Sequence, residues 1–423
     1  MQDDLDADDD TLLRLTRWAL AITAAAMPLY VVRWHLGPLP TTLLENLELI
    51  TVGLYVLTLV RHRAPLPRRT SLDIPIALFL LAGVIGILVA PDHRGALGIV
   101  RAYLIEPIAL YYVAVAVLRN RKDVEMFLAV WGVGAVLFCC AQFAAFIHAA
   151  QIGKIDPDNA PGAFDINPNS VSLLLDPLIA VATGFALFER GRARQAALAF
   201  LVIIVPADIS TLSRGGLLAI GVLFLVAVAT TQSWRSQVVW IGGAVVTGFI
   251  LWHLPILGPR IARTLNPTSG TFAGRGRIWA ATLRMLKDHP VFGAGVNSYQ
   301  TTMAPYRAAD RWLVPEPYPH DIFLTSWTEL GLLGLAVFAF LLVFLIVQPF
   351  RALRRAGLEH RALLWGLGSA FAMILAHGLV DSPYWKNDLS LEFWMLAALE
   401  IFTLKAVSAT ATREEPRAAT TRA

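Results

Sequence analysis

Residues 322–348 read IFLTSWTELGLLGLAVFAFLLVFLIVQ, and Glu329 is the one charged side chain in this run. A helix needs ~20 mostly apolar residues to cross the hydrocarbon core of a bilayer, so this stretch predicts a transmembrane helix. The whole chain has the same character: of its 423 residues 56% are hydrophobic and 16% are charged, with a mean hydropathy of +0.59. Soluble domains have about 25% charged residues. A soluble enzyme and a nucleic-acid-binding domain are therefore excluded.

Further apolar segments of similar length occur along the chain. We expect an all-α polytopic membrane protein with about twelve transmembrane helices, at residues 15–34, 42–60, 72–90, 96–118, 124–149, 170–188, 195–210, 214–231, 237–254, 322–348, 362–380 and 389–408. The connection between the ninth and tenth of these helices is the one long enough to form a unit outside the membrane.

Lysine and arginine indicate the sidedness of the helices, because they are enriched in short cytoplasmic connections. With both termini in the cytoplasm, the inner connections carry 21 Lys and Arg and the short outer ones carry 6. This predicts an acidic cytoplasmic tail at 1–14, helices at 15–254 and 322–408, a large outer loop at 255–321 and a cytoplasmic tail at 409–423.

Common cofactor motifs are absent: the sequence has no P-loop, no Gly-rich dinucleotide motif, no zinc-ligand spacing and no internal repeat. Cys139 and Cys140 are adjacent in an apolar segment, and we expect them to be small buried hydrophobes. The triplet 156–158 (Asp-Pro-Asp) fits an Asp-x-Asp metal pattern, but it is too short to indicate a metal site, so we expect neither a metal nor a cofactor.

Arg101 and Glu106 are five residues apart, and we expect them on different helix faces.

Polar residues collect where the predicted helices meet the outer side, and such residues are functional candidates by default because they are costly in a membrane. Asn167-Pro168-Asn169 precedes the sixth helix, and it could equally be a proline turn with Asn169 or Ser170 as the helix cap. Ser213-Arg214-Gly215-Gly216 begins the eighth helix. Arg214 could be an ordinary arginine that reaches the interface, but the paired glycines favour a ligand that approaches the backbone.

Two further arginines, Arg275 and Arg277, open a predicted amphipathic helix in the outer loop. Cations at a helix N-terminus oppose the helix dipole, so a neighbouring anion would stabilise both. Apolar residues at helical spacing predict a face against membrane or protein, at Ile278, Trp279, Leu283 and Leu286. The helix is expected to end at Asp288-His289-Pro290, where His289 is a helix-stop residue.

The last two polar groups flank the final helices. His320-Asp321 precedes the tenth helix, where a histidine is often only a cap. His377, Asp381 and Tyr384 lie at the connection between the last two helices, whose aromatic residues could instead form an interfacial belt.

Helices six, eight, ten and twelve would all begin at the outer face. A helix N-terminus has free N–H groups and the positive end of the dipole, which together bind anions. With Arg214, Arg275 and Arg277 nearby, this face is predicted to bind a phosphorylated ligand. Each charge-assisted bond to phosphate contributes roughly 1.5–3 kcal/mol.

In their order and spacing these groups resemble the O-antigen ligase family of membrane proteins, which includes the related O-antigen polymerases. The resemblance runs from about Asn167 to Trp394. Its landmarks are Asn167-Pro168-Asn169, Ser213-Arg214-Gly215, Gly274-Arg275 before Trp279, His289-Pro290, Gly293-x-Gly295, Pro319-His320, Glu329-Leu330-Gly331 and His377…Asp381…Tyr384.

The resemblance implies a GT-C-like fold and a metal-independent transfer of a glycan from undecaprenyl diphosphate at the periplasmic face of the bacterial inner membrane. The acceptor is a lipid A–core sugar in ligases and another lipid-linked repeat in polymerases. The moderate length of the outer loop and the segment at 381–388 favour a ligase, and the polymerase stays open. A secondary transporter is the more distant alternative. It is disfavoured because the polar groups gather at one face and the two halves are unlike.

The resemblance also implies roles for single residues. Arg214 and Arg275 would hold the diphosphate, and His320 would take the proton of the acceptor, kept neutral by the helix N-terminus and the arginines around it. Asp321 stands where the family commonly has Asn, so an amide contact to sugar is in doubt, but its carboxylate could orient His320. The substrate-binding candidates are Arg277, Asn167, Asn169, Ser213, Asp321, His377, Asp381 and Tyr384.

Overall fold

The computed structural model describes residues 11–37, 39–61, 64–155, 160–231, 233–264, 271–308 and 313–420. Within these ranges the chain is helical apart from its connections and one antiparallel hairpin, β1 (Arg33–Leu36) and β2 (Leu39–Thr42). The helices are α1 (Thr11–Ala25), η2 (Met27–Val31), α2 (Leu43–Val60), α3 (Asp73–Val89), α4 (His93–Val100), η3 (Arg101–Ile105), α5 (Glu106–Val117), α6 (Arg121–Gln151), η4 (Ala163–Asp165), α7 (Pro168–Phe188), α8 (Gly191–Ser210), α9 (Arg214–Thr230), α10 (Trp234–His253), α11 (Leu257–Thr264), α12 (Thr271–Asp288), α13 (Tyr299–Ala308), α14 (Ile322–Leu353), α15 (Leu358–Gly378) and α16 (Asn387–Thr420).

The predicted all-α membrane fold is confirmed in outline. Among the described residues, seven helices are long and apolar enough to cross a membrane: α2, the continuous α4–α5, α6, α7, α8, α10 and α14. α3 and α9 are apolar but shorter. The chain is thus a multi-pass membrane protein, and the number of twelve spans stays a prediction.

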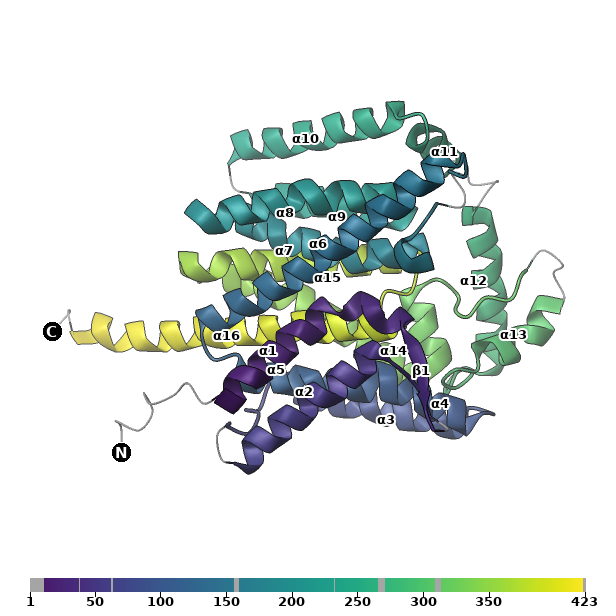
Figure 1. Ribbon diagram of the computed structural model, residues 1–423, viewed down its shortest axis with the longest axis horizontal. Coiled ribbons are helices and arrows are strands. Elements are labelled where there is room, and N and C mark those ends of the chain that lie inside the picture. Colours follow the sequence, from purple (N-terminus) through teal and green to yellow (C-terminus); the bar gives the residue numbers. More distant parts are fainter. Residues whose placement is uncertain are drawn as a thin grey trace.

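The long helices lie side by side and roughly parallel (Figure 1). The start of α1 and the end of α16 lie at one end of this bundle, here called the terminal end. α12, α13 and the β-hairpin lie at the other, here called the site end. Which end of the bundle faces which side of the membrane stays a prediction.

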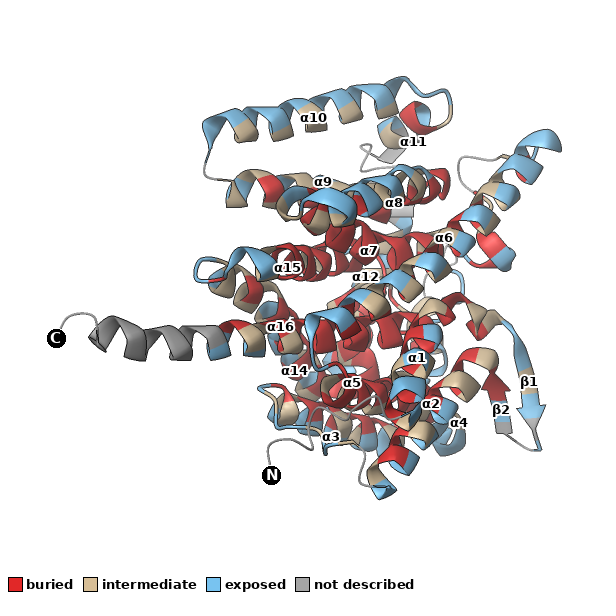
Figure 2. Cartoon of the chain, turned by 60° about the vertical axis from the view of Figure 1, so that its left-hand side comes forward, coloured by how far each residue is buried: buried red, intermediate tan, exposed pale blue. Residues whose placement is uncertain are grey.

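The centre of the bundle is formed by α7 and α15, which are buried along almost their whole length (Figure 2). Gly184 and Gly366 allow them to pack closely, because a Cβ atom at either glycine would overlap the backbone of the other helix. α10 is peripheral and has no buried residue. Elements that converge on α7 and α15 are therefore held more firmly than those near α10.

One expectation inside the bundle is wrong. Arg101 Nε lies 3.5 Å from Glu106 Oε1, and Arg101 Nη2 lies 2.7 Å from Glu45 Oε2, so the two residues do share a face. The reason is a π-helical turn at η3, in which the Glu106 N–H bonds to the Arg101 carbonyl. A π-turn has an i→i+5 period, which brings residues five apart together.

The segment 271–308 has a small core of its own, made of Ala281, Met285, Leu286, Ala294, Tyr299 and Met303. α12 begins at Thr271, three residues before the predicted start, and it ends at Asp288 before His289 as expected. Of the residues predicted to lie against membrane or protein, Leu286 is buried in this core, whereas Leu283 is exposed at the surface of the protein.

A turn at Gly293–Gly295 attaches this segment to α14. Both glycines have positive φ angles, and their missing Cβ atoms allow the backbone to lie directly against α14 and α3. The Ala294 N–H donates to the Thr328 carbonyl at 2.7 Å. α14 is kinked at Gly331, and the Leu332 N–H donates to the Val291 carbonyl at 2.8 Å. The Gly-x-Gly and Glu-Leu-Gly landmarks thus have a docking role in the structure.

We expect the two ends of the bundle to face opposite sides of the membrane. In a chain whose two cysteines are replaced by serine, Gly274→Cys should react with a membrane-impermeant thiol reagent in intact cells, and Arg192→Cys should be protected. Labelling after permeabilisation is the control. Labelling at 192 with protection at 274 would contradict the predicted sidedness. Asp158, which would be a third probe, lies outside the described residues.

Candidate active site

Asp381 is the centre of a polar cluster at the site end. Its Oδ1 atom lies 3.2 Å from His320 Nδ1 and accepts the Ser382 N–H at 2.9 Å. Its Oδ2 atom accepts from Asn169 Nδ2 at 3.1 Å and lies 3.7 Å from Arg275 Nη2. Asp381 therefore joins residues from three other elements, separated by up to 212 positions along the chain.

Asn169 is placed by the start of α7. The Asn167 side chain accepts the Asn169 N–H at 2.9 Å and caps the helix, while Pro168 occupies its first turn. The cap is therefore Asn167 and not Asn169 or Ser170, the two residues expected in that role. The side chain of Asn169 is therefore not needed as a cap and donates to Asp381 instead. Of the two asparagines, only Asn169 contacts the polar cluster around Asp381.

His320 has a strained backbone with φ of 54°, a region that non-glycine residues occupy uncommonly. Two contacts hold it there. Asp321 caps α14 and accepts the N–H groups of Phe323 at 3.0 Å and Leu324 at 2.7 Å. Trp279 Nε1 donates to the Pro319 carbonyl at 2.9 Å, which ties the residue before His320 to α12. Backbone strain of this kind is held by surrounding structure and is common at functional sites.

The cap assignment corrects two expectations. Asp321, not His320, caps α14, so the histidine is not needed to begin the helix. The Asp321 carboxylate is occupied by the two backbone N–H groups and does not orient His320; Asp381 does. Because Asn is as good a cap as Asp, Asn at this position would fill the same role.

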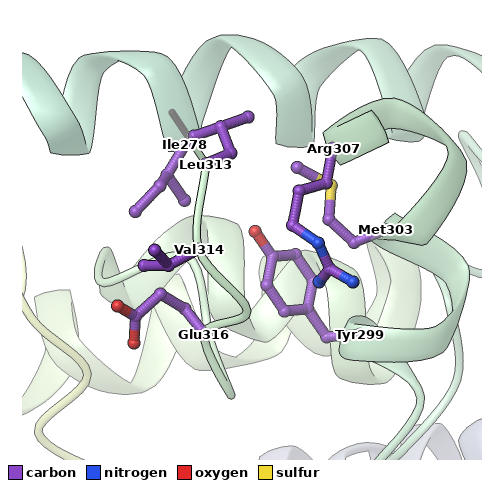
Figure 3. A pocket seen from close by; sticks show the side chains of 7 residues that line it. All are labelled: Ile278, Tyr299, Met303, Arg307, Leu313, Val314 and Glu316. Carbon is purple, nitrogen blue, oxygen red and sulfur yellow. The ribbon is translucent and has the colours of Figure 1, made fainter. Parts of the chain in front are cut away.

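A second carboxylate lies on the other side of the imidazole. Glu316 Oε2 lies 3.3 Å from His320 Nε2, so both ring nitrogens face a carboxylate. Sequence reasoning missed Glu316, although it stands four residues before His320 in a proline-flanked run. Glu316 also lines a small pocket between α12, α13 and residues 313–316, opposite Tyr299 and Arg307 (Figure 3).

The charge state of His320 differs from expectation. Burial alone lowers the pKa of its imidazole, but the hydrogen bonds to Asp381 and Glu316 and the charge of Asp381 outweigh burial and raise the pKa to about 9. Burial alone would raise the pKa of Asp381, but the hydrogen bond and charge of His320, with the charges of His377 and Arg275, lower it. The prediction of a neutral imidazole with a lowered pKa is therefore wrong, because carboxylates distant in sequence surround it.

Two of the three predicted arginines lie close together. The Arg275 side chain is 11% exposed, and burial lowers its pKa while Asp381 raises it and the charge of Arg214 lowers it further. Arg214 is thus near enough to act on Arg275 electrostatically. Arg277 is exposed, and residues two apart on a helix point in opposite directions. The structure does not bring Arg277 into the cluster.

His377 and Ser213 are structural in this fold. Ser213 caps α9 by accepting the Gly216 N–H at 3.2 Å. His377 Nδ1 lies 2.7 Å from Asp176 Oδ2, and both side chains are 1% exposed. A Cβ atom at Gly215 would overlap the His377 ring. The missing Cβ atoms of Gly215 and Gly216 therefore make room for side chains of neighbouring helices to pack against α9. We had expected them to make room for a ligand.

Tyr384 is a core residue. Its hydroxyl donates to the Tyr103 carbonyl at 2.8 Å and accepts from Trp394 Nε1 at 3.0 Å, and the side chain is fully buried among Phe79, Phe338 and other rings. Both bonding positions of the hydroxyl are used within the protein. The predicted contact between Tyr384 and substrate is wrong. Tyr384 is also not part of an interfacial aromatic belt, because its side chain is fully buried in the protein.

Lys386 is a cation that the sequence did not single out. Its Nζ atom donates to Ser170 Oγ at 2.6 Å and lies 5.6 Å from the centre of the Tyr30 ring. Burial lowers its pKa, and the charges of Asp388 and Asp381 oppose this shift. The sequence did offer a signal, because Lys386 directly follows the two aromatic residues Tyr384 and Trp385. Asp156 and Asp158 lie outside the described residues, and elsewhere in the described chain no three or more His, Cys, Asp and Glu side chains form a metal-binding group.

We expect Gly215→Ala to be damaging because the added methyl group has no space. The His377 ring cannot move without breaking its buried contact to Asp176, so overpacking should cost about 1–3 kcal/mol of stability and displace the adjacent Arg214. Thermal unfolding and donor binding measure the two effects. Gly221→Ala on the same helix is the matched control, because nothing lies within 4 Å of its Cβ position. Equal stability of the two variants would contradict this packing argument.

The fold and site together define a multi-pass helical membrane protein with a cluster of arginine, histidine and carboxylate at one end of its bundle. A protein-family model described as O-antigen ligase matches residues 196–339 of the chain. The match extends from α8 into α14 and includes Arg214, Arg275 and His320, whereas Asn169 and Asp381 lie outside it. No curated protein matches the chain. The resemblance found in the sequence is confirmed.

Proposed function

We propose that this protein is an O-antigen ligase, which transfers a glycan from undecaprenyl diphosphate to a sugar hydroxyl of lipid A–core at the periplasmic face of the inner membrane. The family match supports a membrane enzyme of O-antigen processing. The observation that carries the proposal is the convergence of Arg275, His320 and Asn169 on Asp381 at one end of a membrane bundle.

The donor diphosphate would lie against Arg275 and Arg214. The contact between Arg275 and Asp381 is loose, at 3.7 Å, so a phosphate oxygen can compete for the guanidinium with better geometry. Arginine binds phosphate with two parallel donors. The N-termini of α7 and α9, which carry Asn169 and Arg214, add the positive ends of their dipoles. Two neighbouring guanidinium groups are stabilised by an anion that pairs with both.

The reaction would be an inverting displacement. The oxygen of the acceptor hydroxyl forms a bond to the anomeric carbon of the glycan while the bond from that carbon to the diphosphate oxygen breaks. The electron pair of the broken bond goes to the diphosphate, where Arg275 and Arg214 stabilise the growing charge. The acceptor proton goes to His320 Nε2 once the contact to Glu316 opens. Asp381 holds Nδ1 and stabilises the imidazolium that forms.

The acceptor would approach from the pocket beside Glu316, since this pocket lies on the Nε2 side of His320. Tyr299 and Arg307 offer an aromatic face and a donor group there (Figure 3). The volume of this pocket is only about 10 Å³, so it marks a direction of approach and does not enclose a sugar ring.

Reconstitution tests the proposal. The purified protein in vesicles receives a lipid-diphosphate glycan, with lipid A–core in one reaction and only a second donor molecule in the other. We expect a glycosylated lipid A–core and release of undecaprenyl diphosphate in the first reaction. Longer lipid-linked glycan in the second reaction would instead identify a polymerase, which the family match supports equally. Transport of intact donor without transfer would contradict both.

A further inference from the structure

A large apolar cavity lies away from the active site, between α6, α7 and α8. Its volume is about 720 Å³, within the ~300–1,000 Å³ of ordinary ligand sites. α7 contributes Leu178 to Phe185 as its floor, and small residues of α8 such as Ala196 and Ala199 keep it hollow. Two charged residues line it, Glu125 and Arg192. Both lie in the first turns of their helices, at the terminal end.

A polar pocket adjoins this cavity. It has a volume of about 220 Å³ and shares Glu125 and Phe185 with the apolar cavity. Its charged lining residues are Arg119, Arg121, Glu125, Glu189 and Glu359. Arg121 is fixed between two of these carboxylates, with Nε 2.6 Å from Glu125 Oε1 and Nη2 2.9 Å from Glu189 Oε1. An apolar groove and a pocket of mixed charge thus adjoin at Glu125 and Phe185.

We propose that these joined cavities bind a phospholipid, with its acyl chains in the groove and a zwitterionic, amine-bearing headgroup in the polar pocket. Together the two cavities present Arg119, Arg121 and Arg192 to a phosphate, and Glu125, Glu189 and Glu359 to an ammonium group. Guanidinium and phosphate make paired hydrogen bonds, and carboxylates accept from an amine. The predicted sidedness places this lipid in the cytoplasmic leaflet.

The diphosphate of the proposed glycan donor does not reach the polar pocket. This diphosphate would bind near Asn169 in the first turn of α7, whereas Phe185 is 16 residues further along, or about 24 Å at the rise of a helix. The polar pocket at the terminal end therefore needs a headgroup of its own. A separate lipid provides one, and its binding is independent of the proposed ligase activity.

Native mass spectrometry of the full chain tests the proposal after reconstitution in vesicles of phosphatidylethanolamine and phosphatidylglycerol and stepwise delipidation in detergent. We expect about one phosphatidylethanolamine to remain per chain. Ala196→Trp fills the groove and should reduce retention at least tenfold. Leu198→Trp, on the exposed side of α8 (45% exposed) and not in the groove lining, is the control and should retain the lipid.

A second variant covers the case in which Ala196→Trp does not fold. Arg192→Gln leaves the groove unfilled and should weaken retention while the helical content is unchanged. Added phosphatidylethanolamine should raise the Tm of the wild type more than that of this variant, because a ligand that binds the folded state stabilises it. The absence of any retained phospholipid, retention of a polyprenyl lipid in its place, or equal loss from Ala196→Trp and Leu198→Trp would overturn the proposal.

Discussion

Arg275→Ala should lower glycan transfer by roughly 10²–10³-fold, the usual effect of removing one donor that stabilises a developing oxyanion. Arg275 is the arginine that the structure fixes beside Asp381. Arg275→Lys keeps the charge but loses the paired geometry, so it should recover only part of the activity. The measurement is kcat and KM for the lipid-linked donor. A ground-state contact would raise KM alone, whereas a contact to the growing charge lowers kcat.

Arg284→Ala is the matched control, because Arg284 lies on the same helix and is exposed. It should behave as the wild type. Arg214→Ala should resemble Arg275→Ala, since the two guanidinium groups lie within electrostatic reach of each other. Full activity of Arg275→Ala would remove this residue from the mechanism, and unfolding of the variant in detergent would show up in its thermal melt.

Much of the fold could be predicted because it depends on local composition. Apolar runs of membrane length, bounded by basic connections, indicate helices whatever their neighbours are. Local chemistry also indicated that a helix ends just before His289 and that another begins near Asn169, although its cap is Asn167. The π-turn at Arg101 could not be predicted, because nothing in its composition sets it apart from an ordinary α-helical segment.

The site was predicted less well, for a physical reason. The sequence indicated which residues lie at the site end but not which of them touch. Asp381 meets Asn169 across 212 positions, and that pairing depends on how α7 packs against α15. Tyr384 was misassigned for the same reason. Its hydroxyl was predicted to contact substrate, but it bonds to Tyr103 and Trp394, which are distant from it in the sequence or on another turn. Residues distant in sequence also determine the protonation state of side chains in the site.

His320 shows how a distant partner changes the chemistry. At a predicted helix N-terminus, on the same face as the predicted arginines, its pKa should fall. In the fold the two carboxylates of Asp381 and Glu316 hold its ring nitrogens, and its pKa rises to about 9. With a pKa near 9, roughly one imidazole in a hundred is neutral at pH 7. A base must be neutral to accept a proton, so the resting enzyme holds most of its His320 in the inactive form.

The second large effect follows from this. If His320 takes the acceptor proton, kcat/KM should rise with pH, about tenfold per unit, until it levels near pH 9, because this limb reports the free enzyme. His320→Asn should remove the limb and lower the rate by roughly 10²–10⁴-fold. Asn is suitable because it tolerates the positive φ of this position, and because Asp321 caps the helix in either case. An unchanged pH profile in His320→Asn would show that the histidine is not the base and has only a structural role.

Glu316→Gln separates the two groups that could act as the base. It removes one carboxylate from the imidazole, so the pKa of His320 should fall and the rising limb should move to lower pH. At pH 7 more His320 is then neutral, and kcat/KM should increase above that of the wild type. If Glu316 itself accepts the proton, the same substitution should instead lose activity at every pH. Asp381→Asn would not give this distinction, because it also releases Asn169 and Arg275. The direction of the change at neutral pH in Glu316→Gln therefore decides whether the histidine or the carboxylate beside it is the base.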